Sequence, residues 1–65
     1  MQNMHDEPSE RELLTELERA ARSFIQACEQ IEFGIQTRDV SCIEVGEEMR
    51  DAAIREMRRI LEKVE

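Results

Sequence analysis

Apolar residues recur every three or four positions along the first half of the chain. Counted from Leu14, the steps alternate between three and four residues for three full repeats, which is the spacing of a heptad seam on an α-helix. This predicted seam contains Leu14, Leu17, Ala21, Phe24, Cys28, Ile31 and Ile35. Three further apolar residues widen the stripe to the width expected in a helical bundle; they are Leu13, Ala20 and Ala27.

The start of this helix is marked by Ser9 and Glu12. They have the spacing of a capping box, in which each side chain accepts a hydrogen bond from the other residue's backbone N–H. We therefore predict a helix over about 9–35. Residues 1–8 are polar and carry no periodicity, so we expect a disordered tail there.

The second half of the chain repeats this organisation. Ser41 and Glu44 form a second possible capping box, and Val40 and Val45 have the spacing of a hydrophobic staple. We predict a turn over 36–40 and a second helix over about 41–64. Its apolar stripe contains Cys42, Gly46, Met49, Ala53, Met57, Ile60 and Val64.

The two stripes match when the second helix is folded back on the first. Leu17 with Ile60, Phe24 with Ala53, Cys28 with Met49, Ile31 with Gly46 and Ile35 with Cys42 all have residue numbers that sum to 77. Several of these pairs set a large side chain against a small one, which fills a core without voids. The predicted fold is therefore all-α, an antiparallel two-helix hairpin.

A single hairpin leaves the flanks of both stripes open to water. The flanking residues are Leu13, Ala20, Ile25, Ala27, Ile43, Ile54 and Leu61. Monomeric proteins seldom expose a continuous apolar strip of this kind. We expect two hairpins to pair into a four-helix bundle as a homodimer, with a heteromeric bundle as the alternative.

Size and charge narrow the choice of partners. The chain has 65 residues, 16 acidic against nine basic, and a formal net charge of −7. This balance disfavours non-specific binding to DNA or to an anionic membrane. No apolar run is long enough to span a bilayer, and the first residues lack the pattern of a secretory signal. We expect a cytoplasmic protein with reduced thiols.

No combination of residues indicates catalysis, a cofactor or a metal site. The predicted turn offers no nucleophile–base pair, and the single histidine, His5, lies in the predicted tail. In the predicted register Cys28 and Cys42 lie about 10 Å apart along the rod, too far for a disulfide within the chain. We expect both cysteines to be buried as small apolar residues, and we expect no enzymatic activity.

The candidate binding residues are apolar and flank the predicted seam. They are Phe33, Ile25, Ile43, Ile54 and Leu61. Phe33 lies on the outer side of the first helix, where it can either cover the bend onto Val40 or Ile43, or anchor a partner. The leading hypothesis is a small non-enzymatic helical adaptor or regulator that acts by packing its apolar helix face against another protein.

RNA binding is the alternative hypothesis. Arg11, Arg19 and Arg22 lie on the first helix, interleaved with Glu12, Glu16 and Glu18. In its size, its two capped helices and its net acidity, the chain resembles the Rop-type plasmid copy-number regulators. That resemblance is one of architecture, and it implies a dimer of hairpins that holds paired RNA loops.

Overall fold

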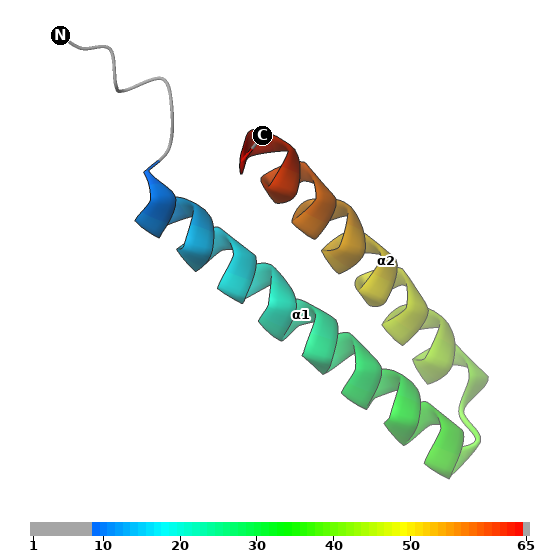
Figure 1. Ribbon diagram of the computed structural model, residues 1–65. Helices are drawn as coiled ribbons and strands as arrows, with labels where there is room; N and C mark the ends of the chain where they lie inside the picture. The colour runs from blue at the N-terminus through cyan, green and yellow to red at the C-terminus, as the bar shows by residue number, and fades with distance from the viewer. Residues whose placement is uncertain (1–8, 65) are drawn as a thin grey trace, which may run out of the picture.

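The computed structural model describes residues 9–64 and contains two helices, α1 (Glu10–Thr37) and α2 (Val40–Val64). The helices run antiparallel and pack along their whole length, joined by a tight turn at one end (Figure 1). The predicted all-α hairpin is confirmed. The predicted tail over 1–8 lies outside the described residues.

The predicted capping box at the start of α1 is confirmed. The Ser9 hydroxyl accepts a hydrogen bond from the Glu12 backbone N–H at 3.1 Å, and the Glu12 carboxylate accepts one from the Ser9 N–H at 3.0 Å. Two of the N–H groups that a helix start leaves without partners are thereby satisfied. Two acidic residues in the first turn, Glu10 and Glu12, also interact favourably with the positive end of the helix dipole.

The connection between the helices is shorter than predicted. α1 continues two residues beyond its predicted end at Ile35, and only Arg38 and Asp39 separate it from α2. Arg38 adopts the left-handed conformation, with φ 55° and ψ 43°, and its N–H donates to the Ile35 carbonyl at 3.2 Å. The Asp39 N–H donates to the Gly34 carbonyl at 2.8 Å. These two bonds satisfy carbonyls at the helix end, so the chain can reverse without a longer loop.

Asp39, rather than Ser41, caps α2. The Asp39 carboxylate accepts a hydrogen bond from the Cys42 N–H at 3.2 Å, and the Asp39 carbonyl accepts one from the Ile43 N–H at 3.1 Å. The predicted cap at Ser41 is wrong because α2 already includes Val40 and Ser41. Aspartate is as good an N-cap as serine, so the sequence offers two competing caps two residues apart.

The buried line on each helix repeats every seven residues. It consists of Ala20, Ala27 and Gly34 on α1 and of Gly46, Ala53 and Ile60 on α2. On α1 this line lies one position before the predicted seam, and two members of that seam, Leu14 and Ile35, are 55% and 61% exposed. The prediction was wrong by one position because the apolar stripe is wide enough for two overlapping seams. The helices pack on the side with the smaller residues, where their backbones can approach more closely.

Two glycines show how close that approach is. A Cβ atom built on Gly46 would lie 2.7 Å from Cγ1 of Ile31, and one built on Gly34 would lie 2.7 Å from Cγ1 of Ile43. Real Cβ atoms do not come so near to a neighbour, so both positions require glycine. The predicted contact of Ile31 with Gly46 is confirmed. Gly34 lies within α1 and allows α2 to pack beside it.

Candidate interaction surface

An apolar face runs along one side of the hairpin. In each helix, the residue one position after each buried-line residue lies on this side. Viewed from one end of the hairpin, one right-handed helix runs away from the viewer and the other toward the viewer, so the same step along the chain leads to the same side in both. We call this surface the open face. It comprises Leu14, Ala21, Ile25, Cys28 and Ile35 of α1 and Val40, Ile54 and Leu61 of α2, interrupted by Glu47.

The large apolar residues of the described chain are mostly not buried. Ile60 is the only large residue whose side chain is fully buried, and the rest of the buried line is alanine and glycine. The larger seam residues Leu17, Phe24, Ile31, Ile43 and Met57 are only partly buried. They follow the open face along its inner edge. The hairpin therefore places its small residues inside and leaves much of its large apolar surface in water.

The predicted flanking strip is divided between the interior and the open face. Ala20 and Ala27 belong to the buried line, at 5% and 0% exposure, so their prediction as open flank is wrong. Among the candidate binding residues, Ile25 and Leu61 are 55% and 52% exposed, whereas Ile43 and Ile54 are partly buried. These four residues lie on the open face or at its inner edge.

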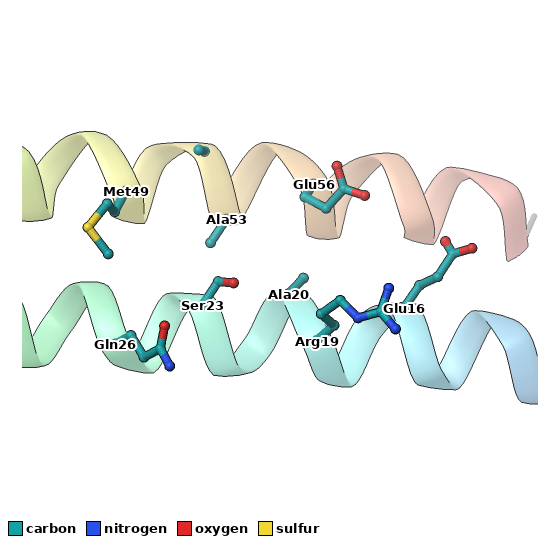
Figure 2. Close-up of a pocket in the computed structure, with 9 residues that line it drawn as sticks. Glu16, Arg19, Ala20, Ser23, Gln26, Met49, Ala53 and Glu56 are labelled. Atoms are coloured by element: carbon teal, nitrogen blue, oxygen red, sulfur yellow. The ribbon is translucent and has the colours of Figure 1, made fainter.

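The opposite side of the hairpin is more polar and carries a shallow trough of about 420 Å³. Ala20 and Ala53 form its floor, and Met49 of α2 extends toward α1 above Gln26 (Figure 2). The trough exists because alanines on the buried line do not fill the space between the helices. Glu16, Arg19 and Glu56 line one end of the trough, and its apolar lining is alanine and Met49 rather than leucine and isoleucine.

Ion pairs on the surface are few and exposed. Arg59 donates to both carboxylate oxygens of Glu56, at 2.6 and 2.7 Å, and Lys63 lies 3.5 Å from Glu16 across the two helices. The hydrogen bond from Arg59 lowers the pKa of Glu56, and the same bond raises the pKa of Arg59. Both groups are solvent-exposed, so these pairs contribute little to the stability of the fold.

The two cysteines are free and differ in environment. Cys28 is exposed on the open face, so its prediction as a buried residue is wrong; it follows Ala27, which takes the interior position instead. Cys42 is partly buried, and its Sγ lies 3.0 Å from Nε2 of Gln30. Its predicted partner in the register, Ile35, points to the other side of the hairpin.

Phe33 lies near the turn and is 58% exposed. This exposure disfavours its predicted role as a cover over the bend, and its role as an anchor for a partner stays a prediction. Arg11, Arg19 and Arg22 are exposed on α1, as are the neighbouring Glu12 and Glu18. No continuous basic surface results on this part of α1, and RNA binding stays a prediction.

The described residues include no group of three histidine, cysteine or carboxylate side chains that could hold a metal ion. Neither of the two helices is long and apolar enough to cross a membrane. In comparisons with protein-family models, with characterised proteins and with solved structures, the chain has no significant match.

Proposed function

We propose that this protein is a small non-enzymatic helical adaptor or regulator that works by packing its apolar helix face against protein. Its first partner is a second copy of the same chain, and the two hairpins form a four-helix bundle through their open faces. The observation that supports this proposal is the placement of small and large apolar residues. Apart from Ile60, the buried residues are alanine and glycine, while most leucine, isoleucine and phenylalanine side chains lie at or near the surface.

The dimensions of the open face suit a stable dimer. A helix of 28 residues is about 42 Å long, and two helices side by side are about 20 Å wide, so the face presents roughly 800 Å². A stable interface typically buries about 800 Å² on each partner. The open face of a second copy has the same length and the same apolar residues. Burying apolar surface between the two copies contributes about 25 cal/mol per Å² to the free energy of association.

The position of Phe33 leaves room for a further protein partner. It belongs neither to the buried line nor to the open face, so it stays exposed when two open faces meet. Exposed aromatic residues are frequent anchors in interfaces. In this proposal the bundle is the scaffold and Phe33 is one of its contact points.

Sedimentation equilibrium tests the dimer directly. We expect the mass of two chains at micromolar concentration for the native sequence. A single folded chain at these concentrations, with full helical circular dichroism, would contradict the proposal.

A matched pair of variants locates the interface. Leu61 lies on the open face and Val45 on the other side of α2, and they are similarly exposed, at 52% and 48%. Leu61→Glu places a charge within the proposed interface and should give monomers, because an unpaired buried carboxylate is costly. Val45→Glu should leave the dimer mass unchanged. Equal effects of the two substitutions would exclude the open face as the interface.

A further inference from the structure

We infer that the two copies pack with their turns at opposite ends of the bundle. The twofold axis is then perpendicular to the helices; it passes near Phe24 and Ile25 of α1 and near Ile54 of α2. This inference rests on the proposed dimer and specifies its geometry. The competing arrangement places both turns at the same end, so that α1 of one copy lies against α2 of the other.

The distribution of charge separates the two arrangements. Residues 29–51, which form the turn half of the rod, contain seven acidic and two basic residues. The remaining described residues, 9–28 and 52–64, contain six acidic and seven basic residues. With the turns at one end, the two acidic halves lie side by side. With the turns at opposite ends, each acidic half lies against a half with a slight positive charge, which removes most of the repulsion.

The apolar residues of α1 are symmetric about Phe24 and Ile25. When α1 packs against a second α1 running the other way, Leu14 lies opposite Ile35, Leu17 opposite Ile31, and Ala21 opposite Cys28. Ile25 then meets Ile25 of the second copy at the axis. With the turns at one end, Ile25 would instead lie at the level of Ala52 of the second copy, and this symmetric pairing of α1 residues would be lost.

The residues of α2 are less symmetric than those of α1. About Ile54, Ile43 lies opposite Val64, but Glu47 lies opposite Leu61 and Arg50 opposite Met57. Residues of α1 and α2 that lie at the same level have numbers that sum to 77, as the contact of Ile31 with Gly46 shows. The two axis positions, near residues 24 and 54, therefore lie at the same level of the hairpin to within about one residue. One twofold axis therefore serves both helices.

The charged residues at the edge of the open face are not all paired in this geometry. Arg50 lies at the level of Arg58 of the second copy, and Asp51 lies one residue further along, within reach of the same arginine. Glu18 lies at the level of Glu32 of the second copy. These side chains reach the outer edge, where water screens like charges, so the balance of charge between the two halves of the rod decides.

Disulfide cross-linking distinguishes the two arrangements, since a disulfide needs Cβ atoms about 4 Å apart. Both test variants keep Cys28 and carry Cys42→Ser. Ala21→Cys faces Cys28 of the second copy only when the turns are at opposite ends, so we expect a cross-linked dimer on a non-reducing gel after mild oxidation. Arg50→Cys faces Cys28 of the second copy only when the turns are at the same end, so we expect no cross-linked dimer.

The outcomes separate this inference from the proposed dimer. Sedimentation of each variant under reducing conditions first establishes whether a dimer is present. A dimer that cross-links through Arg50→Cys, or one that does not cross-link through Ala21→Cys, would overturn the inferred geometry and leave the proposed dimer intact. A monomer in both variants and in the native chain would overturn the dimer itself. A Ser23→Cys variant on the opposite side of α1, in the same background, controls for random collision.

Discussion

Single residues decide how closely the two helices pack. Gly34 and Gly46 lie where the partner helix leaves no space for a Cβ atom, and Ala20, Ala27 and Ala53 continue the same close contact along the rod. Each of these residues contributes little apolar area of its own. Their effect is to bring the backbones together, so that the larger neighbours Ile31 and Ile43 gain contacts with the opposite helix.

Gly46→Ala tests this close contact. Alanine favours a helix by about 1 kcal/mol over glycine, yet the added Cβ would lie 2.7 Å from Cγ1 of Ile31 and 3.0 Å from its backbone nitrogen. Overpacking costs about 1–3 kcal/mol, so we expect a net loss in the free energy of unfolding, measured by chemical denaturation. In an Ile31→Ala background Gly46→Ala should cost less, because the Cγ1 atom that the new Cβ would meet is absent. A variant more stable than the native chain would show that the helices do not pack this closely.

At the scale of the elements, each helix begins at a side chain that accepts backbone hydrogen bonds. The sequence marks Ser9 clearly, because Glu12 follows it at the spacing of a capping box and the apolar stripe begins directly afterwards, at Leu13. At α2 both Asp39 and Ser41 are suitable caps, but only Ser41 has a glutamate three residues later, so the local pattern favoured the residue that is not used. Asp39 is used because Arg38 adopts the left-handed conformation, which brings the chain around within two residues.

A comparison of Asp39→Ala with Ser41→Ala tests which residue caps α2. Loss of an N-cap costs about 1 kcal/mol, so Asp39→Ala should lower the free energy of unfolding by this amount. Ser41→Ala lies at an exposed position within the helix and should change stability by less than about 0.5 kcal/mol. Asp39→Asn keeps the acceptor and should retain most of the native stability. A larger loss for Ser41→Ala than for Asp39→Ala would contradict the assignment.

At the scale of the whole molecule, the hairpin has a more apolar side and a more polar side. The trough side carries polar residues over a floor of alanine, whereas the open face carries leucine and isoleucine. α1 has two overlapping heptad seams that share Leu17, Phe24 and Ile31. α2 occupies one of these seams, and in the proposed bundle a second copy occupies the other.

Thermal unfolding gives a test at this scale. If folding and dimerisation are coupled, the midpoint temperature must rise with protein concentration, because association stabilises the folded chain by mass action. We expect an increase of a few degrees for each tenfold rise in concentration, followed by circular dichroism. Leu61→Glu should remove this dependence, and Val45→Glu should keep it. A midpoint that is constant over a hundredfold range would indicate a folded monomer.

The sequence by itself determined the two helices, their antiparallel packing and the capping box at Ser9, because helical periodicity and capping are local properties. It also determined the contact of Ile31 with Gly46, since the register of a hairpin follows from the position of its turn to within about a residue.

The tertiary structure alone decided which of the two seams on α1 is buried, so that Ala20 and Ala27 lie inside while Leu14, Cys28 and Ile35 lie outside. A wide apolar stripe is compatible with either choice, and periodicity measures only that the stripe exists. The choice depends on how closely two backbones can approach, which is set jointly by small residues on both helices. For the same reason, the open face could be defined only after the buried line was known.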